Sequence, residues 1–183
     1  MVRWPAGIHK PGRTHDGLIG QTDLLATFAE LIGASMPDDA GEDSQSFVRL
    51  ITDANALIER LPLINHTNTS TFRYSITVGD WKLIMPGREQ GVELYDLSND
   101  RMETTNLAAR EPDLVKKLTN RITEIVVNGR TTAGQAQAND SGYWQDLTWI
   151  SKEEFERATN RTKTSLTPAA TLGLPINTTT SDF

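Results

Sequence analysis

An alternation of apolar and polar residues between positions 72 and 85 restricts the possible folds of this chain more than any other feature. Successive side chains of a β-strand point to opposite faces, so a period of two predicts half-buried strands. Gly79 and Asp80 interrupt the alternation, and such a pair between two alternating runs predicts a hairpin. The run from Val92 to Leu97 predicts a further strand, and together these runs predict a small antiparallel sheet.

Helical spacing of apolar residues is found on both sides of this predicted sheet. The clearest helix is predicted from Pro112, since proline suits a first helical turn, to Asn128. An earlier helix is predicted to begin at Thr22 or Asp23 and to end at Gly33. Its apolar stripe consists of Leu24, Leu25, Phe28, Leu31 and Ile32. The short segment around this helix offers the stripe little to be buried against.

Two shorter helices complete the expected secondary structure. One is predicted from about Ser46 to Asp53, and Ser151 with Glu154 has the capping-box spacing that begins another. Residues 34–69 are expected to be connecting loops around a short helix. Residues 131–183 are expected to be an extended tail that is disordered in part, because they are rich in polar residues. The predicted class is α+β, with three to four antiparallel strands and one long helix packed on them.

Composition excludes several classes of function. The chain has 18 Lys and Arg residues against 24 Asp and Glu, and its basic residues are scattered, which argues against a nucleic-acid partner. The lack of cysteine excludes disulfides, thiolate metal sites and a cysteine nucleophile within these residues. No apolar run approaches the length of a membrane span, so none is expected.

Four short motifs occur in the order known from one enzyme family. They are Trp4-Pro5-Ala6-Gly7 leading to Thr22-Asp23-Leu24-Leu25, then Gly79-Asp80-Trp81-Lys82-Leu83, then Glu93-Leu94-Tyr95-Asp96-Leu97 leading to Asn106-Leu107-Ala108, and finally Asn128-Gly129-Arg130. Each motif alone is weak, but their order and spacing resemble the C-terminal portion of the sulfatases, arylsulfatase-like members of the alkaline phosphatase superfamily. Four positions depart from the family pattern and leave the subfamily open, namely Ala26, Thr77, Arg101 and Ala133.

The resemblance implies a division of the chain into parts of a larger enzyme. Residues 1–33 would be the end of a large N-terminal α/β sulfatase domain, and residues 70–130 would form a small C-terminal subdomain. An apolar helical stripe without a visible partner is what such a tail piece would show. Met1 is then interpreted as an internal methionine of a truncated gene product.

The reaction centre of a sulfatase is expected to lie outside these residues. The family uses a formylglycine made from Cys or Ser in a C/S-x-P-x-R motif, a calcium ion, and Lys and His residues, all upstream of the Trp-Pro segment. Ser35-Met36-Pro37 shares Ser-x-Pro with that motif, but Asp39 stands where Arg is required. Asp38 and Asp39 are interpreted as solvated acids, because calcium takes six or more oxygen ligands. We therefore predict no catalytic residue, no metal ligand and no cofactor held by this chain.

His66 is the candidate for contact with a substrate. Some sulfatases carry a His-containing loop just before the first strand of the small sheet, which reaches toward the substrate pocket. The alternative is an exposed loop histidine with no role in binding. His9 and His15 are expected at the surface of the entry loop, and Trp81 and Tyr95 are interpreted as core residues of the sheet instead of sugar-stacking platforms.

The resemblance implies a sulfuric ester hydrolase for aryl or carbohydrate sulfates, of which this portion alone is inactive. The parent enzyme is expected to bind calcium, to carry formylglycine, to meet its sulfated small molecule or glycan through the N-terminal domain, and to be exported to the periplasm or the cell exterior. Two alternatives remain open. One is a phosphoesterase or phosphonate hydrolase of the same superfamily, and the other is a non-enzymatic module that binds a sulfated glycan or a protein.

Overall fold

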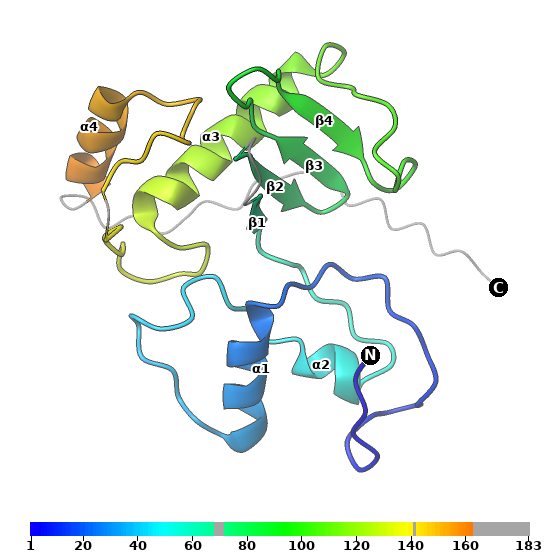
Figure 1. Cartoon of the computed structure of the whole chain (residues 1–183). Helices are drawn as coiled ribbons and strands as arrows, with labels where there is room; N and C mark the ends of the chain where they lie inside the picture. Colours follow the sequence, from blue (N-terminus) through cyan, green and yellow to red (C-terminus); the bar gives the residue numbers. More distant parts are fainter. Residues whose placement is uncertain (68–71, 141, 163–183) are drawn as a thin grey trace.

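The computed structural model describes residues 1–67, 72–140 and 142–162. Its elements follow in the order α1 (Asp23–Ile32), α2 (Val48–Thr52), β1 (Leu63–His66), β2 (Tyr74–Val78), β3 (Trp81–Ile84), β4 (Glu93–Asp96), α3 (Pro112–Asn128) and α4 (Lys152–Thr162). They form two groups (Figure 1). The N-terminal unit (residues 1–61) holds α1 and α2, and the C-terminal unit (the described residues from 62 to 162) holds the sheet, α3 and α4. None of the described helices is long and apolar enough to cross a membrane.

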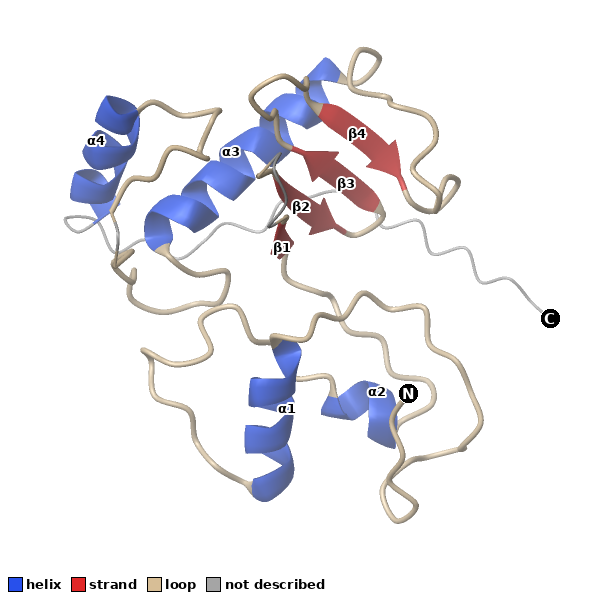
Figure 2. Ribbon diagram, viewed as in Figure 1, coloured by secondary structure: helices blue, strands red, loops and turns tan. Residues whose placement is uncertain are grey.

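One antiparallel sheet with the strand order β1-β2-β3-β4 is the base of the C-terminal unit. Val78 pairs with Trp81 across the predicted hairpin. Gly79 takes φ 55° in the turn, a left-handed conformation that glycine adopts without a Cβ clash. The long helix α3 packs on one face of the sheet, as predicted (Figure 2). Their shared core contains Ile76, Leu83, Met85 and Leu94 from the sheet side and Leu118, Ile122 and Ile125 from α3.

The outer edge of β4 is closed by the Asn106-Leu107 motif. Oδ1 of Asn106 accepts a hydrogen bond from the backbone N–H of Leu94 at 3.1 Å, and its Nδ2 donates to the carbonyl of Val92 at 3.3 Å. The backbone N–H of Leu107 then donates to the carbonyl of Leu94 at 2.8 Å. An unpaired strand edge can template association with another chain, so this amide side chain protects the sheet.

Two expectations about the loops and the tail are wrong. Residues 34–69, expected to be connecting loops around a short helix, also contain the edge strand β1. The expected extended tail is folded as far as residue 162, where α4 ends. Leu147 and Phe155 are 0% and 3% exposed and pack with Val127 of α3. Ser151 and Glu154 form the predicted capping box. The disorder expected beyond residue 162 lies outside the described residues.

Helix α1 spans the predicted residues but buries its polar side. Asp23 and Thr27 are its buried residues, at 0% and 1% exposure. All five residues of the apolar stripe are exposed, from 37% for Leu31 to 79% for Ile32. Fully burying a large apolar side chain is worth roughly 1.5–3 kcal/mol. Within the described chain, no surface covers the stripe fully, so the free energy of burying it is not gained. The sequence predicted a stripe without a visible partner.

The carboxylate of Asp23 accounts for this orientation of α1. Its Oδ1 accepts hydrogen bonds from Nη2 of Arg60 at 2.8 Å and from the backbone N–H of Gln45 at 3.0 Å. Its Oδ2 accepts one from the backbone N–H of Gly20 at 2.7 Å. The side chains of Arg60 and Asp23 are only 7% and 1% exposed. A buried carboxylate needs such complete pairing, so the polar side of α1 must face inward.

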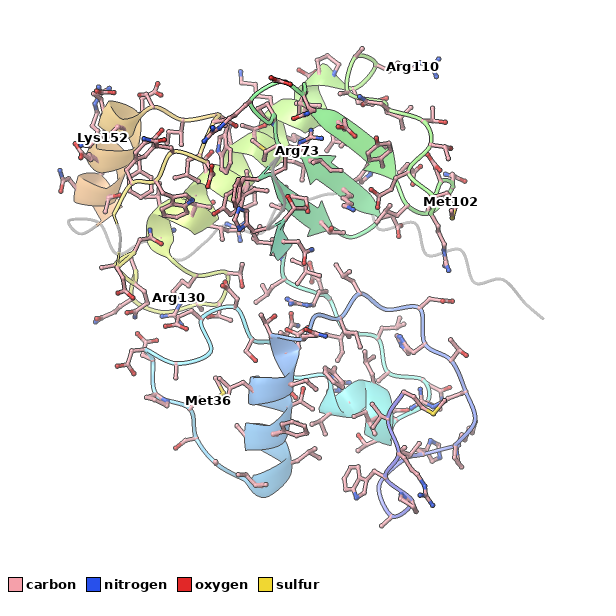
Figure 3. The ribbon with its side chains drawn as sticks, in the orientation of Figure 1. Met36, Arg73, Met102, Arg110, Arg130 and Lys152 are labelled. Carbon is pink, nitrogen blue, oxygen red and sulfur yellow. The ribbon has the colours of Figure 1, made fainter. Side chains whose placement is uncertain are left out.

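A loop that follows α3 ties the two units together. The side chain of Arg130 is 6% exposed, and its Nη1 donates to the carbonyl oxygens of Asp38 at 3.0 Å and Gln135 at 2.9 Å. Thr132 binds the carbonyl of Glu42 through both its N–H and its hydroxyl. Figure 3 labels Arg130 between the two units. We call these contacts between residues 130–135 and 38–43 the Arg130 clasp.

Removing the Asp23 carboxylate should loosen the N-terminal unit. In Asp23→Ala, Arg60 is left as a buried cation without its partner, and breaking a buried pair in this way costs about 3–5 kcal/mol. Asp16→Ala is the matched control, because the pair of Asp16 with Arg101 is exposed and 3.7 Å long, and such pairs contribute little. Urea unfolding followed by circular dichroism measures both losses. Equal, small losses would contradict the role given to Asp23.

Candidate functional site

His66 is the last residue of β1 and pairs with Tyr74, the first residue of β2. It therefore belongs to an edge strand and not to a loop before the first strand, which corrects the expected position. Its imidazole is exposed and lies on the ring of Tyr74, with 4.3 Å between the ring centroids and 18° between the planes. The ring of Phe72 stacks at 6.0 Å and 25°. An exposed imidazole is thus held against an aromatic surface at the edge of the sheet.

Tyr74 is held in turn by the segment that follows α3. Nε1 of Trp144 donates a hydrogen bond to the Tyr74 hydroxyl at 2.7 Å, and the Trp149 ring meets the Tyr74 ring edge-on at 5.5 Å and 68°. Burial raises the pKa of Tyr74, the hydrogen bond from Trp144 partly opposes this shift, and the charge of Asp146 adds to it. Tyr74 is therefore a neutral phenol at neutral pH.

Sequence reasoning missed this support for His66. The segment that supplies Trp144 was assigned to a tail on its polar composition. Its sequence nevertheless contains Tyr143, Trp144 and Trp149 within seven positions. Disordered segments are poor in aromatic residues, so this group was the available signal of a packed segment.

His9 and His15 lie in the N-terminal unit and have local partners. Nδ1 of His9 accepts from the backbone N–H of Ala54 at 3.4 Å, and Nδ1 of His15 accepts from that of Gly17 at 2.8 Å. Both side chains are exposed, as predicted. They belong to a different unit from His66.

The residues considered as a nucleophile or as metal ligands do not come together. Ser35 and Asp39 are exposed in the loop after α1, and Asp38 is a partner in the Arg130 clasp. No group of three or more His, Asp and Glu side chains among residues 1–67, 72–140 and 142–162 is placed to hold a metal ion. Calcium takes six to eight oxygen ligands, so the described residues do not fit a calcium ion. We derive no reaction step through one.

A cluster of charged groups lies on the face of the sheet opposite α3. Arg73 (labelled in Figure 3) donates through Nε to the carbonyl of Met85 at 2.9 Å and forms an ion pair with Glu93. The Tyr95 hydroxyl donates to Oε2 of Glu93 at 2.6 Å, and this hydrogen bond is the main cause that raises the pKa of Tyr95 to about 12. Burial alone would raise the pKa of Glu93, but hydrogen bonds from Tyr95 and Arg73 hold it below its usual value.

Perturbed pKa values often mark functional sites, but this cluster has the character of a structural network. Arg73, Glu93 and Tyr95 are all paired within the sheet. Tyr95 is 7% exposed, which confirms it as a buried residue. Trp81 is partly buried against the sheet core, where the sequence placed it. The region around His66, with its exposed ring and aromatic neighbours, is therefore the better candidate for contact with a ligand. Its aromatic contacts favour binding over catalysis.

Several known proteins are similar to this chain, and these are sulfatases. A family model described as N-sulphoglucosamine sulphohydrolase, C-terminal, matches residues 1–128. The N-acetylgalactosamine-6-O-sulfatase of Bacteroides thetaiotaomicron is 28% identical over 139 residues, which cover 68% of this chain and 26% of the relative. The ulvan-active sulfatase of Formosa agariphila is 31% identical over 147 residues, which cover 62% of this chain and 29% of the relative. The chain thus spans roughly a quarter of the length of these curated relatives.

Among solved structures, a Bacteroides thetaiotaomicron protein assigned to the sulfatases has the same arrangement of elements. The TM-score is 0.55 at 20% sequence identity, and the match covers 72% of this chain and 31% of the other. A likeness at this identity supports the α+β fold alone.

The hydrogen bond from Tyr95 to Glu93 should make stability fall in alkaline solution. The pKa of Tyr95 is about 12 in the folded chain and about 10 when unfolded. The contribution of this raised pKa to the free energy of unfolding is thus complete below pH 10. Above that pH unfolding releases a proton, so the contribution falls and is lost as the pH rises through 12. Thermal unfolding of the wild type and of Tyr95→Phe between pH 8 and 12 measures this loss. A pH dependence that is unchanged in Tyr95→Phe would contradict the assignment.

Proposed function

The chain belongs to the sulfatase family, and we propose that it is the C-terminal portion of an enzyme that hydrolyses sulfate esters of carbohydrates. The match of the family model to residues 1–128 carries this proposal. Both curated relatives described above are sulfatases as well, and one of them acts on N-acetylgalactosamine 6-O-sulfate. Aryl sulfates are the alternative substrates.

The outward stripe of α1 supports the proposed division of the chain. In this proposal residues 1–33 complete a large N-terminal domain, and the exposed residues of the stripe are buried in it. Residues 70–130, together with β1, then form the small C-terminal subdomain. An apolar patch that is exposed on a soluble chain commonly marks such an interface.

The chemistry of ester cleavage is assigned to the part of the enzyme upstream of Met1. Cleavage needs a nucleophile, a cation that stabilises the sulfonyl oxygens and an acid for the leaving oxygen. The family supplies these groups as formylglycine, calcium and upstream Lys and His residues. The described residues bring no such set together. Export to the periplasm or the cell exterior is part of the proposal, because polymeric sulfated glycans lie outside the cell.

His66 is the residue of this chain that we propose to touch the substrate. Its imidazole is exposed at a sheet edge and is oriented by Tyr74. An imidazole can donate a hydrogen bond to a sulfate or hydroxyl oxygen, and a sugar ring can lie against neighbouring aromatic side chains. These properties support a binding role at the rim of the substrate site. The bond itself is cleaved by other groups.

Two rival functions remain testable. A phosphoesterase or phosphonate hydrolase of the same superfamily would share the small subdomain and differ in its nucleophile. A binding module for a sulfated glycan or a protein would need to fold as a closed unit. The exposed stripe of α1 counts against the closed unit.

Residues 1–183 alone should hydrolyse neither 4-nitrophenyl sulfate nor 4-nitrophenyl phosphate above background, with or without added calcium. The longer protein that includes the upstream region, produced with formylglycine formed, should hydrolyse a 6-O-sulfated hexosamine. Initial-rate assays with both proteins provide the test. Turnover by residues 1–183 that disappears when one of them is substituted would overturn the proposal, and a preference of the longer protein for phosphate or phosphonate esters would favour the rival hydrolase.

Helix α1 should exchange its amide protons faster than α3 in the isolated chain. A helix of 10 residues is marginal without packing, and the large residues on the apolar side of α1 are 37% to 79% exposed. Helix α3 buries four residues against its neighbours and should be protected. Hydrogen exchange of monomeric protein, read by mass spectrometry, gives the comparison. Equal protection of Asp23–Ile32 and Pro112–Asn128 would favour the self-contained binding module.

A further inference from the structure

The support of His66 comes from a part of the chain beyond the family match, which ends at residue 128. His66 and Tyr74 face each other across β1 and β2, and their rings stack at 4.3 Å. The Tyr74 hydroxyl accepts the indole N–H of Trp144 at 2.7 Å. A continuous chain of contacts therefore runs from Trp144 through Tyr74 to the exposed imidazole.

Trp144 is itself fixed by several anchors on both sides of it along the described chain. Nδ2 of Asn139 donates to the carbonyl of Val126 at 3.0 Å, at the end of α3. Nε1 of Trp149 donates to the Thr123 hydroxyl at 2.9 Å, in the middle of α3. Leu147, between these anchors, is 0% exposed. The segment cannot shift without breaking buried contacts, so Trp144 presents its N–H at a fixed place.

The hydrogen bond from Trp144 to Tyr74 affects the orientation of His66, because the two rings of His66 and Tyr74 are stacked. The phenol ring offers one flat surface to the imidazole, and rotation of that ring would remove the stacking contact. A hydroxyl that is half-buried needs a hydrogen-bond partner, and Trp144 supplies one that also sets the direction of the C–O bond. The same bond therefore limits the displacement of the ring beneath His66, and the edge-on contact with the Trp149 ring limits its rotation.

We propose that Trp144 is a positioning residue that holds His66 in its orientation through Tyr74, and that residues 142–150 are a specificity-determining segment of the substrate site. The effect on substrate rests on the proposed function of His66, whereas the effect on the imidazole does not. The segment fixes where the imidazole points at the sheet edge, and so selects which sulfated sugar can meet it.

Proton NMR of the 183-residue chain tests the positioning directly. The Cδ2 and Cε1 protons of His66, assigned by their loss in His66→Ala, should show an upfield displacement from the Tyr74 ring current. Trp144→Phe keeps an aromatic ring but removes the N–H donor, and it should move both resonances toward the positions of a free histidine. Tyr74→Phe, which removes only the hydroxyl, should give the same change even if Trp144→Phe fails to fold.

Tyr143→Phe is the matched control for this experiment. It removes a hydroxyl donor from the same segment, but that hydroxyl is bound to the carbonyl of Ile150 at 3.2 Å and its ring contacts Phe155. The His66 resonances should stay in place in this variant. Unmoved resonances in both Trp144→Phe and Tyr74→Phe would overturn the proposal. An equal movement in Tyr143→Phe would also overturn it, because the effect would then be one of general packing.

Kinetics of the longer enzyme separate this proposal from the proposed function. His66→Ala and Trp144→Phe should both raise the KM for a 6-O-sulfated hexosamine and leave kcat nearly unchanged, because both act on uniform binding. If the resonances move but neither variant changes KM, the assignment of His66 to substrate fails and the positioning by Trp144 stands. A lowered kcat with an unchanged KM in Trp144→Phe would contradict the proposed role of the segment in recognition.

Discussion

The pairing of the Asp23 carboxylate with Arg60 decides which way the first helix faces, and the character of the N-terminal unit depends on it. A charge this deeply buried requires a full set of donors, and Arg60, Gln45 and Gly20 provide them from three separate places in the chain. Once that side of α1 is fixed inward, the apolar stripe can only face outward. The unit thus holds α1 by polar contacts, keeps a small apolar cluster of its own around Phe47, Leu50 and Ala56, and leaves the stripe of α1 exposed.

The elements that the sequence predicted correctly are those whose cause is local. Gly79 allows the left-handed turn between two strands, and Pro112 and Gly129 begin and end the long helix by backbone chemistry that needs no distant partner. Strand β1 escaped prediction because its two apolar residues are adjacent and are followed by Asn65 and His66, so no apolar and polar alternation marks it. Its existence is decided by pairing with β2. The contact that fixes the direction of α1 was equally out of reach, because Arg60 lies 37 residues from Asp23.

The candidate site divides in the same way between local and distant causes. His66 was found from its place in a family resemblance, whereas Trp144, which lies 70 residues from Tyr74, gave no local sign of the contact. Polar composition suggested a disordered tail, but a few large aromatic side chains are enough to anchor a polar segment when each finds a hydrogen-bond partner on a helix or sheet. The average composition of a segment does not show a few such aromatic residues, so it conceals that the segment is packed.

The two units are joined at more than one point, and this has a consequence for the site. The chain passes directly from Arg60, the partner of Asp23, into β1, and the Arg130 clasp fixes the loop after α1 to the end of α3. A single connection would leave the units free to turn about it, whereas several separated connections, the exposed pair of Asp16 with Arg101 among them, restrict their relative orientation. The edge of the sheet that carries His66 is thus oriented relative to the outward face of α1. If that face is seated on a catalytic domain, as proposed, the seating also determines where the imidazole of His66 lies. The small subdomain would then affect which substrate reaches the reaction centre.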